Sequence, residues 1–382
     1  MTPLPIMESR YLVLQKTFAA FQATGIPLLF ETNSGYTPAI TADDIGLYCI
    51  IPSMMQWFSI SLENAITTFF NGTMIFSLIM AAIGFFLSYK SWVTRSIVLM
   101  GLALTAQSML PTMDVYRISG TVIFGTLPLF LYFIRKNHTS LWLYPFLVYA
   151  GLYAGLAQYI RIHSGTNIIL FIVLCLLLHT KFNITKKLLL ICTFMFGFVL
   201  SSSYFMYQWH KHVIYIEQHL PEHHADKGAH VFWHQVYLGF GFLQNDYNIQ
   251  YDDHVADMKV QSICPNTPYP CKKSERLLRE EVFKLILEHP IFALYTYSAK
   301  VGILLLLLFL FANVGLLAAW LYRKPWYIDL AFIATLSFSA LPGLLTIPTI
   351  FYLLGFTACA TLYGLTSIGD AVEHNIRKKA LS

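Results

Sequence analysis

Charged residues are scarce in this sequence: only 12% of its 382 residues are Asp, Glu, Lys or Arg. A soluble protein keeps about a quarter of its residues charged. Hydrophobic residues reach 56% and aromatic residues 16% instead. We therefore expect lipid to surround much of the surface, which excludes a soluble globular domain. The net charge of +5 is no signal for nucleic acid, because basic residues report orientation in membrane proteins.

Long apolar runs predict the fold class. A hydrocarbon core of about 30 Å needs about 20 apolar residues per helix. Candidate runs cover residues 11–31, 64–88, 92–111, 118–134, 140–159, 166–180, 187–207, 291–322, 325–343 and 347–366. The first is the weakest, because it carries Gln15, Lys16 and Gln22, and an interfacial helix is its alternative. No basic stretch precedes it, so we do not expect a removable signal peptide. The prediction is all-α: a polytopic helical membrane bundle of about ten spans with two large outer-face loops.

The distribution of Lys and Arg predicts the orientation. With a cytoplasmic N terminus, the inside segments are SYKSWVTR, FIRKNHTS, HTKFNITKK, LYRKPW and the tail EHNIRKKALS, each with two or three basic residues. The short outside connections are nearly free of them, apart from Arg117 and Arg161. By the positive-inside rule both termini are cytoplasmic, and the long segments 32–63 and 208–290 lie outside. The compact chain favours a prokaryotic inner membrane.

Three regions follow from this topology. Residues 1–207 form a transmembrane module that contains the first outer loop, 32–63. Residues 208–290 form a large outer, periplasmic loop, and residues 291–382 form the last transmembrane helices and the cytoplasmic tail. No internal repeat is visible, which weakens the case for a transporter.

Two cysteines in the second loop, Cys264 and Cys271, stand in the short segment CPNTPYPC. The short spacing and the prolines between them favour a disulfide in an oxidising compartment. A metal pair is the alternative, but no further cysteines stand at ligand spacing. The same loop holds nine of the thirteen histidines without a specific metal-ligand spacing, so no metal site is predicted.

Adjacent carboxylates, Asp43 and Asp44, stand in the first loop within TADDIGLY. Thr41 and Asp44 match a helix capping box, which is a structural role for Asp44. Asp43 then stands in the first helical turn, where the helix dipole favours a negative charge. Pro52 is expected to end or kink this helix, and the following SMMQWF segment suits a membrane interface.

Cations near the same membrane face are candidates for binding an anion. Lys300 lies about ten residues into the eighth span, and Arg161 and His163 follow the fifth span with no acidic residue close in sequence. A lipid phosphate would suit both, although Lys300 could also snorkel or pair with a carboxylate. Arg117 is a weaker candidate, because an ion pair with Asp114 on a helix surface explains it equally well.

This arrangement resembles the GT-C superfamily of integral membrane glycosyltransferases, which use polyprenyl-phosphate-linked sugars. The resemblance lies in ADDIGLY near the first outer helix and in the large loop 208–290, and it covers residues 11 to 320. It implies that Asp43 is the catalytic base, with Asp44 beside it, and that transfer inverts the sugar. Arg161, His163, Lys300 and Arg117 would bind the donor. Side chains of the kind on which sugars pack are Trp233, His234, Tyr237 and Asp252.

The implied partners are a polyprenyl-phosphate sugar, a glycan, lipid or protein acceptor, and membrane lipid, with no nucleic acid. No cofactor is predicted, and assistance by a divalent cation is left open. Two other functions remain as alternatives. An envelope polysaccharide polymerase or ligase would rely on Arg and His rather than a first-loop acid. A lipid-linked sugar transporter or flippase would show broken helices, and LPGLL in the ninth span keeps this class open.

Overall fold

The protein is almost entirely helical. The computed structural model describes residues 8–33, 35–39, 45–136, 139–219, 232–267, 269, 271–322 and 324–381. The helices before the second outer segment are α1 (Glu8–Thr24), α2 (Ile45–Phe58), α3 (Leu62–Ser88), α4 (Trp92–Met109), α5 (Arg117–Lys136), α6 (Leu143–Ile160), α7 (Ser164–Leu178) and α8 (Ile184–His219). The later helices are α9 (Phe232–Gly239), α10 (Asp253–Ile263), α11 (Lys272–Glu288), α12 (Pro290–Ala312), α13 (Val314–Leu321), α14 (Trp326–Leu345) and α15 (Leu354–Leu381). A 3₁₀ turn (Phe240–Phe242) follows α9.

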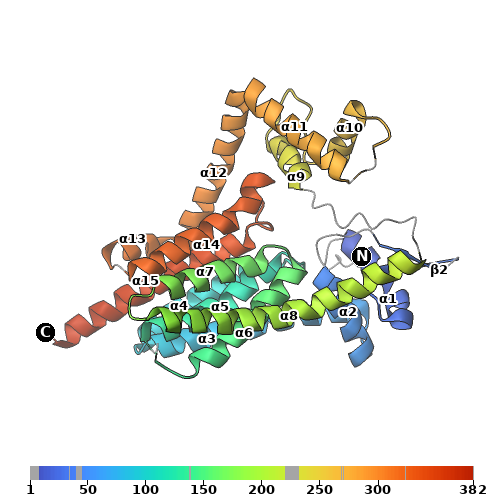
Figure 1. The fold of residues 1–382 in the computed structure, drawn as a ribbon. Coiled ribbons are helices and arrows are strands. Elements are labelled where there is room, and N and C mark those ends of the chain that lie inside the picture. Colours follow the sequence, from blue (N-terminus) through green and yellow to red (C-terminus); the bar gives the residue numbers. More distant parts are fainter. Residues whose placement is uncertain are drawn as a thin grey trace.

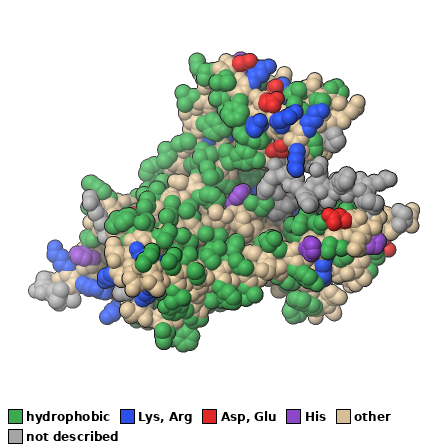
Figure 2. All heavy atoms as spheres, in the orientation of Figure 1, with side chains coloured by type: hydrophobic (Ala, Val, Ile, Leu, Met, Phe, Trp, Pro, Cys, Tyr) green, Lys and Arg blue, Asp and Glu red, His purple; other side chains and the backbone are tan. Residues whose placement is uncertain are grey.

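Five of these helices are long and apolar enough to cross a membrane: α3, α5, α8, α12 and α14. They pack with α4, α6, α7 and α15 in one bundle, in which α12 stands at a steep angle to the other helices and extends away from them toward α11 (Figure 1). Hydrophobic side chains cover the flank of the bundle (Figure 2). Every apolar run except the first corresponds to a helix of this bundle. The run 291–322 is divided at Asn313, which has a φ of 36° and caps α13 through its side chain. The helical bundle is confirmed, and the protein is a membrane protein by length and composition of its helices.

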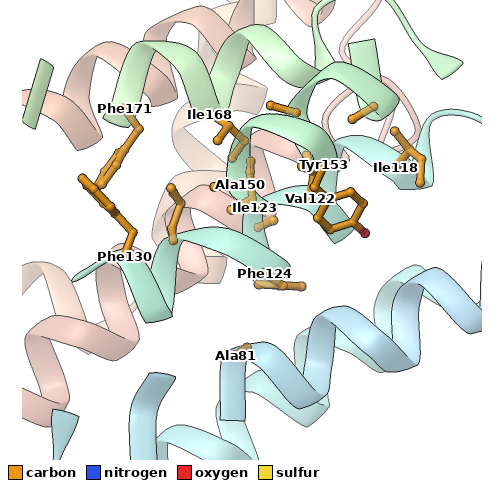
Figure 3. Packing of buried hydrophobic residues seen from close by; sticks show 14 of the residues in the cluster. Ala81, Ile118, Val122, Ile123, Phe124, Phe130, Ala150, Tyr153, Ile168 and Phe171 are labelled. Atoms are coloured by element: carbon orange, nitrogen blue, oxygen red, sulfur yellow. The ribbon is translucent and has the colours of Figure 1, made fainter. Parts of the chain in front are cut away.

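The centre of the bundle is α5, most of which is buried. Phe130 of α5 meets Phe171 of α7 edge-on at 6.1 Å between ring centroids (Figure 3). Close approach of α6 and α8 depends on glycine, because a Cβ at Gly151 would collide with the backbone of Phe194 and one at Gly197 with that of Val148. Small residues at such crossings let membrane helices pack by van der Waals contact.

The first predicted span does not cross the bundle. Arg10, near the start of α1, pairs with Asp114 in the α4–α5 connection. Shortly after α1, the Pro27 carbonyl lies 2.9 Å from Nδ1 of His212 near the end of α8. Both ends of the segment therefore contact the same end of the bundle, and α1 is not among the described helices that are long and apolar enough to cross a membrane. The described chain therefore begins at this end of the bundle, and α1 does not run to it from the opposite end.

A short hairpin follows α1. Strands β1 (Leu29–Thr32) and β2 (Gly35–Pro38) are antiparallel, with Leu29 opposite Pro38. The helix α2 runs through Pro52, so the helix does not end there. The Ser53 hydroxyl donates to the Cys49 carbonyl at this turn, and such local side-chain bonds let apolar helices tolerate an interior proline.

The basic connections meet at the other end of the bundle, around the second half of α15. Arg135 at the end of α5 donates to both carboxylate oxygens of Asp370, each at 2.8 Å. Glu373 accepts hydrogen bonds from the backbone N–H groups of Lys90 and Ser91 at the start of α4. At the start of α14 the Tyr327 ring lies 5.3 Å from that of His179 after α7, which brings the α7–α8 turn to this end as well. The segregation of charge that the positive-inside pattern requires is therefore present in the fold.

A separate module formed by α9, α10 and α11 stands beyond the opposite end (Figure 1). It has its own hydrophobic cluster, in which Leu238 of α9, Val260 of α10 and Leu278 of α11 are buried. α11 ends at Glu288 and α12 begins at Pro290, as the sequence predicted for the entry into the eighth span. The module lies within the predicted outer segment 208–290, but α8 continues as one helix to His219 before it.

Candidate functional site

The ring of Tyr116 lies between two arginines at the end of the bundle from which the module projects. Arg10 of α1 lies 5.4 Å from the ring centroid, and Arg161, which follows α6, lies 4.6 Å from it. Cations over aromatic faces are attracted by the ring quadrupole. Three segments far apart in sequence therefore place two guanidinium groups on one aromatic platform, which we call the Tyr116 cluster.

The connection between α4 and α5 positions this platform. Asp114 accepts a hydrogen bond from the backbone N–H of Val115 at 2.6 Å, which fixes the turn before Tyr116. The same carboxylate accepts from Arg10 at 3.0 and 3.2 Å. Both partners are largely buried, so this ion pair fastens α1 to the bundle.

Tyrosines extend the cluster toward the module. The Tyr116 and Tyr352 rings meet edge-on at 5.0 Å, and the Tyr352 hydroxyl lies 2.8 Å from that of Tyr251. The Tyr251 hydroxyl donates to the side chain of Gln235 in α9 at 3.4 Å. Burial raises the pKa of Tyr116 and Tyr352 to about 12. These hydroxyls therefore stay protonated at physiological pH and can donate hydrogen bonds.

The first turn of α2 lies against the chain that leads into Arg161. A Cβ at Gly46 would stand 2.8 Å from the Tyr159 carbonyl carbon and 2.9 Å from the Ile160 nitrogen. The predicted carboxylates Asp43 and Asp44, together with the N-cap Thr41, lie outside the described residues. The described chain resumes at Ile45, directly after them.

Arg161 and His163 occupy the sharp turn between α6 and α7. His163 has a φ of 80°, in the left-handed region, and its ring lies 6.0 Å from that of Phe338. Behind this turn the hydroxyls of Ser119 and Ser164 lie 2.6 Å apart. His163 is exposed whereas Ser164 is buried, so the turn presents the histidine outward from a packed base.

Arg117 is not paired with Asp114 as the sequence suggested. Its guanidinium is fully buried and donates to the Asn71 side chain of α3 at 3.1 Å. Its Nε and Nη2 atoms have no hydrogen-bond partner within the described part of the chain. The reason for the difference is that α5 begins only at Arg117, so Asp114 precedes the helix and its carboxylate turns to Arg10.

Lys300 is also buried and lies apart from the Tyr116 cluster contacts. Its ammonium group donates to the Leu344 carbonyl of α14 at 2.9 Å and lies 5.1 Å from the Tyr297 ring centroid. A Cβ at Gly239 would lie 3.0 Å from the Lys300 Nζ atom, so α9 covers this lysine. Direct contact between Lys300 and a lipid phosphate would require α9 to move.

The four candidate residues of the module have identifiable structural roles. His234 is buried, with Nε2 2.9 Å from Asp253 and Nδ1 against the Tyr269 hydroxyl. The hydrogen bond from His234 holds the pKa of the Asp253 carboxyl below its usual value. Asp252 caps α10 by accepting from the His254 N–H at 3.0 Å. The Trp233 ring packs on Phe283, and Tyr237 is buried in the module core.

The predicted disulfide is not formed in the structure, where Cys264 and Cys271 are free thiols. The Cys264 Sγ atom accepts from the Lys273 ammonium group at 2.9 Å, and this hydrogen bond lowers the pKa of the thiol. Cys271 is buried and serves as the N-cap of α11 by accepting from the Ser274 N–H at 3.3 Å.

An apolar groove of about 310 Å³ opens between α2, α6 and α8. Its lining includes Ile50, Met54 and Trp57 of α2 together with Leu156 of α6 and Phe205 of α8. The groove therefore lies along α2, the helix whose first turn packs against the backbone of Tyr159 and Ile160 just before Arg161. Within the described ranges, the structure contains no group of three His, Cys, Asp or Glu side chains that could hold a metal ion.

Comparison with family models, curated proteins and solved structures gives no match for this chain. The site therefore has to be argued from its own geometry. Sequence reasoning identified Arg161 and His163 but missed Arg10, Tyr116, Tyr251 and Tyr352. The only sequence signal for Tyr116 was its place between Asp114 and Arg117, and the partnership with Arg10 had none.

Proposed function

We propose that the chain is a membrane glycosyltransferase that moves a sugar from a polyprenyl phosphate to an envelope acceptor at the outer face. The observation that carries this proposal is the juxtaposition of the α2 start, directly after Asp43 and Asp44, with the segment leading into Arg161. An acid and a phosphate-binding cation are the two groups that such a transfer needs. The resemblance of ADDIGLY and the large outer loop to GT-C enzymes supports the same function.

The proposed topology has nine crossing helices: α3 to α8, α12, α14 and α15. The basic segments around Arg135 and Lys90 then face the cytoplasm, as the positive-inside rule favours. The Tyr116 cluster, the hairpin and the module face outward, with the C terminus cytoplasmic and α1 on the outer surface. A prokaryotic inner membrane remains our preferred location.

The proposed chemistry is a single inverting displacement. Asp43 takes the proton of an acceptor hydroxyl as that oxygen forms a bond to the anomeric carbon. The bond between this carbon and the phosphate oxygen breaks, and the lipid phosphate leaves with the electron pair. A phosphate is stable as an anion, so no acid needs to protonate it.

The described residues would divide the remaining work. Arg161 would stabilise the leaving phosphate through the planar set of N–H donors of its guanidinium group. His163 lies in the same turn as Arg161, and Arg10 lies over the same Tyr116 ring, so both could assist it. The hydroxyls of Tyr251 and Tyr352 would donate to the sugar. The groove beside α2 would accept the start of the prenyl chain. Arg117 and Lys300 would support the site from beneath, since both are buried in this conformation.

The test uses a deletion strain that carries the wild-type gene, Asp43→Asn or Arg161→Gln. The matched control is Asp246→Asn, an exposed outer-segment carboxylate in a part of the module apart from the cluster. Intact masses of lipid-linked and surface glycans are compared at equal membrane abundance. We expect wild type and control to restore one sugar mass and the two variants to lose it.

Other outcomes would identify the alternatives. Unchanged sugar composition with shortened glycan chains would indicate a polymerase or ligase. Accumulation of the lipid-linked sugar on the cytoplasmic face would indicate a flippase. Full restoration by Asp43→Asn would remove Asp43 as the base and with it the mechanism.

A further inference from the structure

The helix α11 presents two faces of different chemistry. Leu278, Val282 and Leu285 are buried against the rest of the module. The exposed side of the helix carries mostly basic residues. Its exposed charged residues are Lys272, Lys273, Arg276, Arg279 and Lys284, with Glu280 and Glu288 as the acids.

The remaining carboxylates of α11 are engaged within the module. Glu275 accepts from the backbone N–H groups of Trp233 and His234 at 2.8 and 3.1 Å. Glu281 pairs with Lys259 of α10 at 2.7 Å. The exposed side of α11 therefore has an excess of positive charge, and a partner with negative charge would complement it.

The same side ends in large apolar residues. Phe283 is 51% exposed and Leu287 is 78% exposed. The helix α12, which is apolar enough to cross a membrane, continues this surface with Ile291 at 83% and Leu294 at 70%. Figure 1 shows α11 running across the end of α12 at a wide angle rather than in line with it. The apolar end of α11 is therefore continuous with the flank of a membrane helix.

A hollow of about 650 Å³ lies where the charged and the apolar residues of α11 meet. Trp233, Phe283 and Leu287 form its apolar wall, and the charged residues that line it are Arg279, Lys284, Glu280 and Glu288. The excess of positive charge therefore belongs to the exposed side of α11 as a whole, which carries five basic residues and two acids. Amphipathic helices of this composition lie in the membrane interface with aromatic and aliphatic side chains at the acyl boundary. Basic residues beside them attract anionic headgroups.

We propose that α11 docks on anionic phospholipid of the outer leaflet, with Phe283 and Leu287 at the acyl boundary and Arg279 and Lys284 on headgroup phosphates. Docking would hold the module at a fixed height above the bundle. The inference rests on the surfaces of α11 and the start of α12 and on the proposed orientation of the module, and it does not depend on the proposed transferase activity.

The test uses the full-length protein in nanodiscs of phosphatidylcholine with or without phosphatidylglycerol. Leu287→Cys is labelled with an environment-sensitive fluorophore after Cys192 and Cys264 are replaced by Ser, because the other four cysteines are buried. We expect quenching by lipids that carry a quencher in the acyl chain and protection from aqueous iodide. Quenching by iodide alone would place Leu287 in water and overturn the docking.

A second measurement tests the headgroup preference. Hydrogen exchange of the α11 peptides should be slower with phosphatidylglycerol, and Lys284→Glu should reduce this difference about fivefold or more. Lys16→Glu on α1 is the matched control and should leave it unchanged. Equal exchange of wild-type α11 in both nanodiscs would overturn the anionic preference, and equal loss in both variants would assign it to overall charge.

Discussion

Arg10 and Asp114 are separated by 104 positions and form an ion pair of 3.0 Å at the end of the bundle that carries the Tyr116 cluster. The sequence predicted that α1 crosses the membrane, whereas this ion pair holds α1 at the end of the bundle. Asp114 also fixes the turn before Tyr116, so one carboxylate positions both α1 and the Tyr116 ring.

A double-mutant cycle on this pair should show strong coupling. Arg10→Gln or Asp114→Asn alone is expected to lower the free energy of unfolding by about 3 kcal/mol, because each leaves a largely buried charge without its partner. The coupling free energy between the two sites should be about 1 to 3 kcal/mol. Thermal unfolding in detergent measures it, and additive effects would show that the pair does not fasten α1.

Tyr116 should contribute through its ring rather than its hydroxyl. Tyr116→Phe keeps the face on which Arg10 and Arg161 lie, whereas Tyr116→Leu removes it. We expect Leu to raise the KM for the lipid-linked donor about tenfold, in line with a loss of about 1 to 2 kcal/mol of cation–π attraction. Phe should stay within about twofold of wild type. Equal effects of both substitutions would point to the hydroxyl.

His163 offers a way to separate stability from activity. Its φ of 80° is costly for any residue except glycine, by about 1 kcal/mol. His163→Gly should therefore match or slightly exceed wild type in thermal stability, whereas His163→Ala keeps the strain. If His163 contacts the donor, both variants lose transfer activity. Full activity of His163→Gly would show that the histidine serves only the turn.

Cys264 should be the more reactive of the two module thiols. The Lys273 ammonium group lowers the pKa of Cys264, so its thiolate forms at a lower pH than in an ordinary cysteine. The rate of alkylation should rise at lower pH in wild type than in Lys273→Gln, where the pKa moves back up. Mass spectrometry of the labelled protein follows both sites, and Cys271 should react slowly because it is buried. A mass two hydrogens lower without reductant would reveal the disulfide that the sequence suggested.

The bundle was predictable from sequence because a run of apolar residues long enough to cross lipid is a signal contained within one segment. Most of the later runs became helices within a few residues of the expected ends. The exceptions are the run 291–322, which divides at Asn313, α8, which continues to His219, and α15, which covers Leu354–Leu381 where the run was 347–366. The first run failed because Lys16 and the glutamines already marked it as partly polar, and its place was decided by Arg10 and a distant carboxylate.

The candidate site was less predictable because its residues meet only in three dimensions. Arg161 could be identified because the short outside connections carry few other basic residues. The contacts of Tyr116 with Arg10 and Tyr352 join segments from the beginning and the end of the chain, and no local pattern encodes them. The pairing of Asp114 with Arg117 was wrong because it assumed a helix where the chain forms a turn.

The hydrogen bonds of Glu373 to the start of α4 have a consequence for how the protein is made. The carboxylate that covers the N–H groups of Lys90 and Ser91 is synthesised more than 280 positions after them, as the separation of 283 and 282 residues requires. During translation the end of the bundle at which α4 begins therefore lacks this carboxylate until α15 has been synthesised. A truncated chain that ends before residue 373 would leave the N–H groups of Lys90 and Ser91 without this carboxylate, and we expect proteases to cleave it more readily.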